Sequence, residues 1–187
     1  MKRIVIFASG SGSNAENLIK FFQNSENANV TLVITNNPYA KVLGRCKVLK
    51  TPALSFNKPA FFDSDVILNV LKAENPDLII LAGFLWKFPE VILKEFPKSV
   101  INLHPALLPK FGGKGMYGMN VHKAVINQKE TKTGITIHYV NENYDEGAII
   151  FQATCKVEIT DVPDDVAAKI HKLEMKHFPE VVEKLLN

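Results

Sequence analysis

The chain has 187 residues, of which 47% are hydrophobic and 22% are charged, with 22 Lys and Arg against 19 Asp and Glu. This length suits one globular domain of ordinary size, and the net charge of +3 is too small to indicate a nucleic-acid-binding surface. The longest apolar run, Leu78–Trp86, has about half the length that a membrane span needs. We therefore expect neither a nucleic-acid partner nor a membrane partner.

The start of the chain and its cysteines predict a reducing, cytoplasmic setting. The apolar run behind Lys2 and Arg3 is too short for the core of a signal peptide. Cys46 and Cys155 lie far apart with no paired spacing, which predicts neither a disulfide framework nor a zinc site.

Short apolar runs predict strands, and helical patterns separate most of them, as in a mostly parallel sheet covered by helices. Strands are expected at residues 3–8, 30–35, 53–56, 78–82, 99–103, 134–140 and 148–156. The last two form a hairpin across residues 141–147. The predicted fold class is α/β, a Rossmann-like three-layer sandwich with a mostly parallel central sheet and a C-terminal antiparallel hairpin.

Six helices are expected, at residues 15–24, 41–50, 63–74, 89–96 and 121–127 and from residue 163 onward. Asp63 is the expected cap of the third helix, which ends before Asn75-Pro76 because proline disfavours a helical residue before it. A bend is expected before Pro179 in the last helix. Residues 104–120 are rich in glycine and proline, so they predict a long loop, and such loops are usually functional.

The turn from Ser9 to Asn14 lies between the first strand and the first helix. Its glycines let the backbone approach an anion, and the amides at the helix start carry a partial positive charge. The turn therefore predicts a phosphate site; the alternative is a tight turn with Ser13 or Asn14 as the helix cap. The spacing of Gly10 and Gly12 also fits a loose dinucleotide fingerprint. However, no carboxylate ends the second strand to bind a ribose, so a phosphate monoester is the better ligand.

Asn102 and His104 stand at the end of an apolar strand, where ligands of open α/β sheets bind. Alternation places them on the same side, and an amide donor beside an imidazole suits a developing oxyanion and proton transfer. The alternative is a structural histidine next to Pro105. Asp145 is either a carboxylate that raises the pKa of a neighbouring histidine or an ordinary turn residue before Gly147.

Two further groups of residues are less informative. His171 and Glu174 share a helix face and either reach a ligand or form a surface pair. The remaining histidines are assigned to packing or solvent: His122, His138 and His177. No group of His, Cys and acidic residues has metal-ligand spacing, so no metal is expected.

Four motifs, in this order, resemble those of the folate-dependent phosphoribosylglycinamide formyltransferase family of purine synthesis. They are Ser9-Gly10-Ser11-Gly12-Ser13-Asn14, Leu81-Ala82-Gly83-Phe84, Asn102-Leu103-His104-Pro105-Ala106-Leu107-Leu108-Pro109, and Asp145-x-Gly147. The resemblance runs over essentially the whole chain. It implies a single formyltransferase domain over residues 1–187, with a phosphate-binding half at about 1–100 and a catalytic and folate-binding half at about 80–187.

The resemblance also implies ligands and the residues that bind them. Glycinamide ribonucleotide would be held by Gly12, Ser13, Asn14, His171, Lys172, Leu173 and Glu174, with Glu174 orienting the amine. The co-substrate 10-formyltetrahydrofolate would lie against Leu85, Trp86, Lys87, Phe88, Asn102, Asn141, Glu142, Asn143, Tyr144 and Asp145. The catalytic residues would be Asn102, His104 and Asp145, and the enzyme would be a monomer or homodimer.

In the implied reaction, the glycinamide amine attacks the formyl carbon. Asn102 and a protonated His104 stabilise the oxyanion, and Asp145 raises the His104 pKa and positions a water that carries the proton. The chain differs from many relatives at Trp86, where they have arginine, in a shorter segment at residues 63–74, and in a longer loop at residues 111–120.

Other functions remain as alternatives. A formyltetrahydrofolate hydrolase would have an extra N-terminal domain, and a methionyl-tRNA formyltransferase a C-terminal domain and a basic surface, so length and charge disfavour both. A non-catalytic nucleotide- or folate-binding module would not need the set of Asn102, His104 and Asp145. An NAD-dependent oxidoreductase would need the missing ribose-binding acid.

Overall fold

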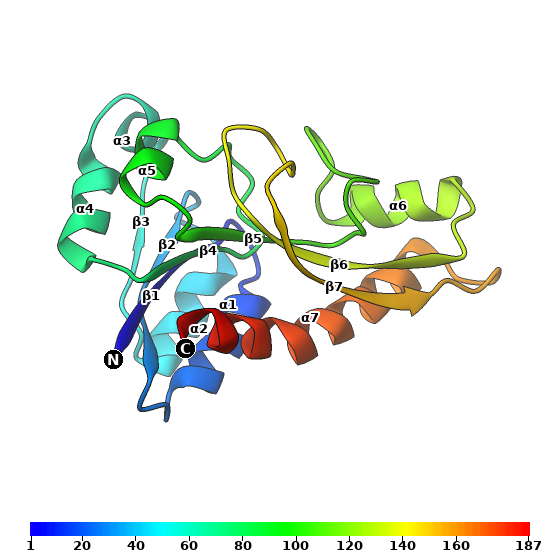
Figure 1. Ribbon diagram of the computed structural model, residues 1–187, viewed down its shortest axis with the longest axis horizontal. Helices are drawn as coiled ribbons and strands as arrows, with labels where there is room; N and C mark the ends of the chain where they lie inside the picture. The colour runs from blue at the N-terminus through cyan, green and yellow to red at the C-terminus, as the bar shows by residue number, and fades with distance from the viewer.

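A seven-stranded sheet in the order β3-β2-β1-β4-β5-β6-β7 forms the centre of the computed structural model, which describes residues 1–187 (Figure 1). The strands are β1 (Lys2–Phe7), β2 (Ala28–Thr35), β3 (Ala53–Ser55), β4 (Leu78–Leu81), β5 (Val100–His104), β6 (Lys132–Tyr139) and β7 (Ile149–Lys156). The first five are parallel, whereas β6 is antiparallel to both β5 and β7. This confirms the predicted strands, the predicted hairpin and the fold class.

Seven helices accompany the sheet: α1 (Ser13–Phe22), α2 (Lys41–Leu49), α3 (Lys58–Phe62), α4 (Val66–Glu74), α5 (Glu90–Glu95), α6 (Met119–Asn127) and α7 (Pro163–Leu186). Helix α3 was not predicted from the sequence, although the Asn57 side chain caps it by accepting from the Ala60 N–H. The expected cap at Asp63 is wrong, because Asp63 ends α3 and Asp65 precedes α4.

Alternation along the strands divides the apolar core into two layers. Ile4 and Ile6 of β1 lie in one cluster, which includes buried residues of α1, α2 and α7. Val5 and Phe7 point to the other face, where α3, α4 and α5 contribute to a second cluster. Because both faces of the central strands are covered, their sequences are continuously apolar, as expected for parallel sheets.

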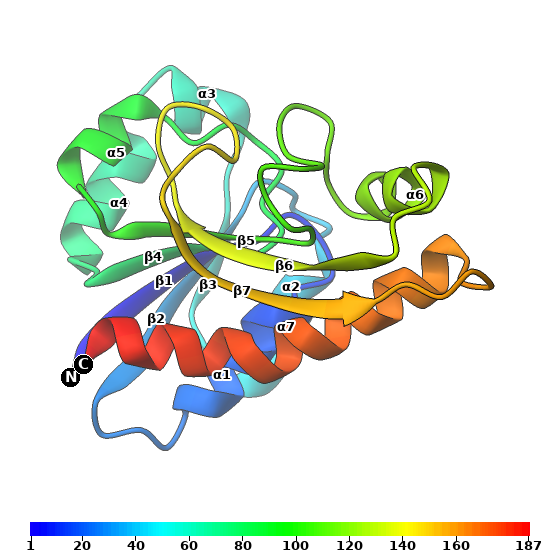
Figure 2. The ribbon, with the colours of Figure 1, turned by 45° about the vertical axis from the view of Figure 1, so that its right-hand side comes forward.

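The C-terminal half builds one wall of the molecule from β6, β7 and α7, which run alongside one another (Figure 2). The α7 helix continues through Pro179, which has no N–H to donate to the carbonyl of Met175. The Asn17 amide of α1 donates to this freed carbonyl at 2.9 Å. The proline therefore provides an acceptor through which α1 and α7 are joined.

The ends of β1 and β4 meet at the point where the strand order reverses. The Ser9 N–H donates to the Gly83 carbonyl (3.1 Å), and the Leu85 N–H donates to the Ser9 hydroxyl (3.0 Å). Open α/β sheets bind ligands beyond the carboxyl ends of strands at such a reversal. No helix in the structure is both long enough and apolar enough to cross a membrane.

Candidate active site

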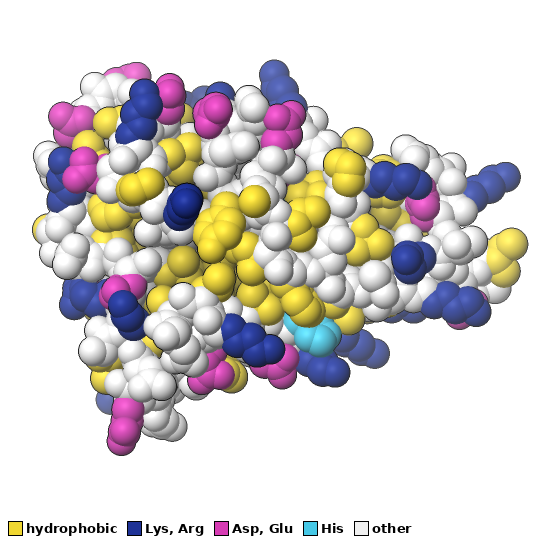
Figure 3. Space-filling view, in the orientation of Figure 1, with side chains coloured by type: hydrophobic (Ala, Val, Ile, Leu, Met, Phe, Trp, Pro, Cys, Tyr) yellow, Lys and Arg dark blue, Asp and Glu magenta, His cyan; other side chains and the backbone are white.

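A cavity of about 760 Å³ opens at the carboxyl ends of β1, β4 and β5. This volume lies within the range usual for small-molecule sites. Its wall is built from the turn after β1, the segment after β4, the end of β5, two loops and the α7 helix. On the face shown in Figure 3, Lys and Arg are interspersed with Asp and Glu, while apolar side chains gather across the middle.

One side of the cavity is the turn that leads into α1. The first hydrogen bond of this helix runs from the Glu16 N–H to the Gly12 carbonyl, so the amides of Ser13, Asn14 and Ala15 have no acceptor within the protein. The helix is preceded by Gly12 and has no side-chain cap, so the alternative that Ser13 or Asn14 caps it is wrong. Free amides at a helix start are of the kind that can bind an anion.

Gly12 is required in this turn for two reasons. Its φ of 72° lies in the left-handed region, and a Cβ there would come within 2.3 Å of the Val42 Cγ2. The turn is also held from α2, since Arg45 Nε donates to the Ser11 carbonyl at 2.8 Å and its guanidinium pairs with Glu16. The free amides are therefore fixed in place by α1 and α2.

Side chains of α1 and α7 meet beside the turn. Asn14 Nδ2 donates to Glu174 Oε2 at 3.0 Å, and His171 Nδ1 lies 3.6 Å from the same oxygen. Burial raises the pKa of Glu174 against the opposing effects of Asn14 and His171. The Asn14 Oδ1 is buried and has no partner. A donor from a ligand would satisfy it.

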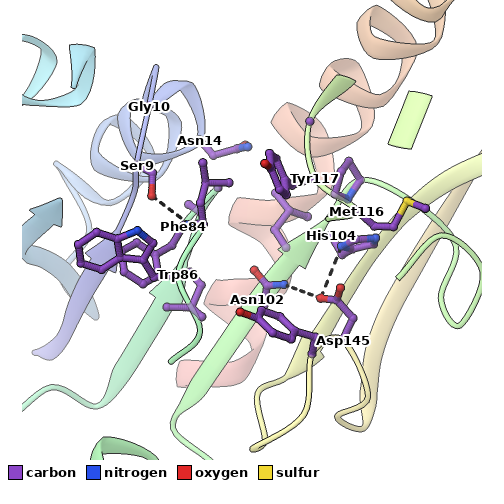
Figure 4. Close-up of a pocket in the computed structure, with 18 of the residues that line it drawn as sticks. Ser9, Gly10, Asn14, Phe84, Trp86, Asn102, His104, Met116, Tyr117 and Asp145 are labelled. Atoms are coloured by element: carbon purple, nitrogen blue, oxygen red, sulfur yellow. Dashed lines mark hydrogen bonds and ion pairs between the residues drawn. The ribbon is translucent and has the colours of Figure 1, made fainter. Parts of the chain in front are cut away.

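The opposite side of the cavity holds Asn102, His104 and Asp145, which converge as shown in Figure 4. Asp145 Oδ1 lies 3.6 Å from His104 Nδ1 and 3.4 Å from Asn102 Nδ2. Its other oxygen accepts the Gly113 N–H at 2.9 Å. Asp145 occupies a turn with φ of 56°, so it is both a turn residue and part of this cluster.

His104 is the last residue of β5 rather than the start of a loop, because it pairs with Thr136 of β6. It is 3% exposed, and Nε2 lies 2.8 Å from the Phe111 carbonyl. A carbonyl only accepts, so Nε2 must carry a hydrogen. In the neutral ring, Nδ1 then has a free lone pair that faces Asp145.

Burial is the largest influence on the pKa of His104 and lowers it, although Asp145 and the Phe111 carbonyl raise it. From the sequence, Asp145 was expected to yield a protonated histidine, but the pKa of His104 is lowered because burial outweighs the carboxylate. Burial also opposes ionisation of Asp145. Its interactions with His138 and His104 and the Gly113 N–H together lower the pKa of Asp145 below its ordinary value.

The Asn102 amide lies between His138 and Asp145. Its Nδ2 lies 3.1 Å from His138 Nε2 and 3.4 Å from Asp145 Oδ1. Figure 4 shows the amide nitrogen turned toward Asp145 and the oxygen turned away from it. Sequence alone could not reveal this orientation, because it depends on a residue of β6 that lies opposite Asn102.

Most of the residues assigned by the resemblance line the cavity. Of the residues assigned to folate these are Leu85, Trp86, Lys87, Phe88, Asn102, Asn141, Asn143, Tyr144 and Asp145, and of those assigned to the ribonucleotide Gly12, Ser13, Asn14, His171 and Glu174. The cavity wall does not include Glu142, Lys172 and Leu173. Glu142 and Lys172 are exposed, whereas Leu173 packs on the core, because successive residues of α7 face different directions.

Several cavity residues were not predicted. The Gly-rich loop contributes Gly113, Lys114, Gly115, Met116, Tyr117 and Gly118, and other elements contribute His122 and His138. The length of the loop was the available signal for the first group. His138 was assigned to packing or solvent, but its strand position opposite Asn102 brings it to the cluster.

Both the sequence and the structure of the chain are similar to those of known proteins. The formyl transferase family model matches residues 2–182. A protein of Bacillus subtilis named phosphoribosylglycinamide formyltransferase is 34% identical, over 100% of this chain and 95% of its own length. A chloroplastic relative of that name from Arabidopsis thaliana is 37% identical over 97% of this chain. The chain spans 64% of the length of this relative and 61% of the length of a chloroplastic relative from Vigna unguiculata. The solved glycinamide ribonucleotide transformylase 1 of Geobacillus kaustophilus superposes with a TM-score of 0.90 at 31% identity, covering 100% of both chains.

Proposed function

The chain belongs to the formyl transferase family, and from this premise we propose that it transfers the formyl group of 10-formyltetrahydrofolate to the amine of glycinamide ribonucleotide. The products are formylglycinamide ribonucleotide and tetrahydrofolate. The observation that carries the proposal is that one cavity contains both the amide turn at Gly12–Asn14 and the cluster of Asn102, His104 and Asp145. A phosphorylated amine bound at the turn can extend across the cavity toward the cluster.

The amide turn would bind the phosphate of the ribonucleotide. The unpaired N–H groups of Ser13, Asn14 and Ala15 support this assignment, because oriented amides at a helix start attract anions. Glu174 and the unpartnered Asn14 Oδ1 would accept hydrogens of the substrate, and Glu174 would orient the amine.

The amine nitrogen attacks the formyl carbon, and the carbonyl oxygen becomes an oxyanion. The amine proton passes to His104 Nδ1, whose lone pair is free because the hydrogen of the neutral ring is on Nε2. Asp145, 3.6 Å from Nδ1, stabilises the positive ring that results. His104 then returns this proton to N10 of the folate as the carbon–nitrogen bond breaks, so that no proton is gained or lost overall.

The same proton transfer supplies the donor that the oxyanion needs. The new Nδ1–H shares the positive charge of the ring and faces the reacting carbon, so it donates to the oxyanion before the proton passes to N10. Nε2 keeps its hydrogen bond to the Phe111 carbonyl at 2.8 Å, which holds the ring in this orientation. Neutral His104 is the resting form that this path requires, in agreement with its lowered pKa.

The folate would lie on the side of the cavity that contains Trp86. The Trp86 ring packs against Phe56, Phe61 and Phe62 with centroid distances of 5.7 to 6.1 Å, so it presents a fixed aromatic surface. We propose that stacking on this surface replaces the contact made by arginine in many relatives. Aromatic stacking typically contributes about 0.5–1.5 kcal/mol beyond the buried area.

We also propose that residues of about 1–100 bind the phosphate and that residues of about 80–187 bind folate and carry out the transfer. The hydrogen bond from Asn14 to Glu174 joins the two parts. A cytoplasmic location is proposed because both Cys46 and Cys155 are free thiols.

The test follows folate absorbance with purified protein, 10-formyltetrahydrofolate and glycinamide ribonucleotide, with formylated product identified by mass spectrometry. We expect formyl transfer that requires the ribonucleotide. Folate turnover that proceeds equally without it would show a hydrolase instead. Binding of both ligands without turnover would show a binding module.

A further inference from the structure

The α2 helix contacts the turn before α1 at three points, and the proposed reaction gives these contacts no role. The Val42 N–H donates to the Gly10 carbonyl at 3.2 Å, and Arg45 Nε donates to the Ser11 carbonyl at 2.8 Å. The Val42 side chain also occupies the space that a Cβ on Gly12 would need. Two successive carbonyls of the turn therefore point toward α2.

The direction of these two carbonyls determines the direction of two N–H groups. Both peptides are trans, and in a planar trans peptide the carbonyl and the N–H point to opposite sides. The Gly10 carbonyl shares a peptide with the Ser11 N–H, and the Ser11 carbonyl shares one with the Gly12 N–H. Both N–H groups therefore point away from α2, and neither has an acceptor within the protein. Because Ser11 and Gly12 line the cavity, these groups extend the row of free amides that begins α1.

We propose that Arg45 is a positioning residue for the phosphate of the ribonucleotide, because it holds the peptide between Ser11 and Gly12 with its N–H toward the ligand. This inference rests on the proposed function, which assigns the phosphate to the turn. Of the two hydrogen bonds from α2 to the turn carbonyls, the one from Arg45 is made by a side chain, so a substitution can remove it. Arg45 lies outside the cavity wall and acts through the backbone of the turn.

The charges around Arg45 allow its orienting role to be separated from simple attraction. Its guanidinium also pairs with Glu16 of α1, and Lys20 Nζ lies 2.6 Å from the other oxygen of this carboxylate. Two cations and one carboxylate leave a net charge of +1 beside the helix start. This charge attracts an anion whatever the conformation of the turn, whereas the hydrogen bond to the Ser11 carbonyl fixes one peptide. Charge and orientation can therefore be changed independently.

The first test follows the turn amides directly and needs no activity measurement. Inorganic phosphate is titrated into ¹⁵N-labelled protein, and the N–H signals of Ser11 and Gly12 are followed by NMR. We expect both signals to shift, and we expect Arg45→Met to weaken phosphate binding roughly 10-fold, the scale of one lost hydrogen bond to a charged group. Lys47→Met is the matched control: it removes the same charge from an exposed position of α2 and should change the affinity little.

Two outcomes of this titration would overturn the proposal. One is that the Ser11 and Gly12 signals do not respond to phosphate. The other is equal weakening in Arg45→Met and Lys47→Met, which would show that only the number of positive charges counts. Both outcomes concern phosphate binding alone, so they are distinguishable from a failure of formyl transfer.

The second test separates orientation from charge in the same titration. The double variant Arg45→Met/Glu16→Gln returns the local net charge to +1 through Lys20, without restoring the hydrogen bond to the Ser11 carbonyl. We expect phosphate binding to stay weakened in this variant. Glu16→Gln alone keeps Arg45 and should bind phosphate at least as well as the unsubstituted protein. Full affinity in the double variant would show that Arg45 acts by charge alone and would contradict the proposal.

Steady-state kinetics distinguish positioning of the phosphate from general support of the fold. In Arg45→Met, the KM for glycinamide ribonucleotide should rise roughly 10-fold, in line with the phosphate titration. The kcat and the KM for 10-formyltetrahydrofolate should change little, because Arg45 contacts neither the cluster nor the Trp86 side of the cavity. A fall in kcat without a change in the ribonucleotide KM, or equal losses for both substrates with a lowered urea midpoint, would contradict the proposal.

Discussion

The two sides of the cavity present different kinds of chemical group. The turn before α1 offers backbone N–H groups, and its shape depends on one glycine packed against Val42. The cluster at the end of β5 instead depends on side chains from two strands and one loop that contact one another, with His104 and His138 almost fully buried. A second loop adds the backbone N–H of Gly113. We therefore expect side-chain substitutions at the turn to have little effect on binding. In the cluster, a substitution that changes a single atom should already lower the activity.

The largest effect should come from removing one charge in the cluster. Asp145→Asn keeps the shape of the side chain but cannot stabilise a protonated His104 ring, so we expect the rate of formyl transfer to fall roughly 100- to 1000-fold. Glu146→Gln, an exposed neighbour in the same loop, is the matched control and should stay near the unsubstituted rate. Steady-state kinetics measure both. Comparable losses in the two variants would mean that the loop, rather than the carboxylate, is being perturbed.

At the turn, we expect the backbone conformation to determine how well the ribonucleotide binds. Gly12→Ala introduces a Cβ at 2.3 Å from Val42 and an unfavourable positive φ, so we expect KM for the ribonucleotide to rise roughly 10-fold or more and stability to fall by about 1–3 kcal/mol. Gly10→Ala is the control, since a Cβ there meets nothing within 4 Å. Ribonucleotide titrations and urea denaturation compare the pair. An unchanged KM in Gly12→Ala would remove the turn from the phosphate site.

The pH profile distinguishes a neutral from a protonated resting His104. Because burial lowers the pKa of His104, kcat/KM should rise with pH and reach a plateau. The midpoint of this rise should lie below the ordinary histidine pKa of about 6.5. Asp145→Asn should move this midpoint to still lower pH, since the carboxylate raises the pKa of His104. A midpoint above the ordinary histidine pKa would show that the resting His104 ring is protonated.

The same shift has a consequence for folding. The unfolded chain binds a proton at His104 more readily than the folded chain, so the free energy of unfolding should decrease as pH falls through the ordinary pKa of histidine toward the lowered one. In His104→Gln this part of the pH dependence should be smaller, as urea denaturation at several pH values would show.

The smallest effect should come from the hydrogen bond between α1 and α7 at Asn17. Asn17→Ala removes the donor to the Met175 carbonyl freed by Pro179, at a cost of about 0.5–1.5 kcal/mol in stability. Kinetic constants should change little because Asn17 does not line the cavity. Chemical denaturation measures the first effect. A large loss of kcat would mean that this hydrogen bond positions the cluster as well.

Much of the fold was predictable because its signals are local. Continuous apolar strands such as Leu78–Leu81, and the break at Asn75-Pro76, are visible in the sequence. The short α3 helix was missed because five residues carry too little periodicity, although Asn57 followed by Pro59 is a readable start signal. Asp63 was mistaken for a cap because the sequence alone does not show that a helix has just ended there.

The candidate site was predictable where its residues belong to one strand or one turn. Asn102 and His104 follow from alternation along β5, and Gly12–Asn14 from the glycine spacing. The position of His138 opposite Asn102 depends on the register between β5 and β6, and the lowered pKa of His104 depends on burial. The local sequence therefore predicts neither. The resemblance supplied the link to Asp145, which spacing alone left as a turn residue.

The most direct test of the account is a single-turnover measurement of formyl transfer in His104→Ala, with the affinity of each substrate measured by calorimetry. His177→Ala, a partly buried histidine outside the cavity wall, serves as the control. We expect both substrates still to bind while the transfer step slows roughly 100-fold or more, and the control to be unaffected. Transfer at an unchanged rate in His104→Ala would contradict the assignment of this cavity as the catalytic site.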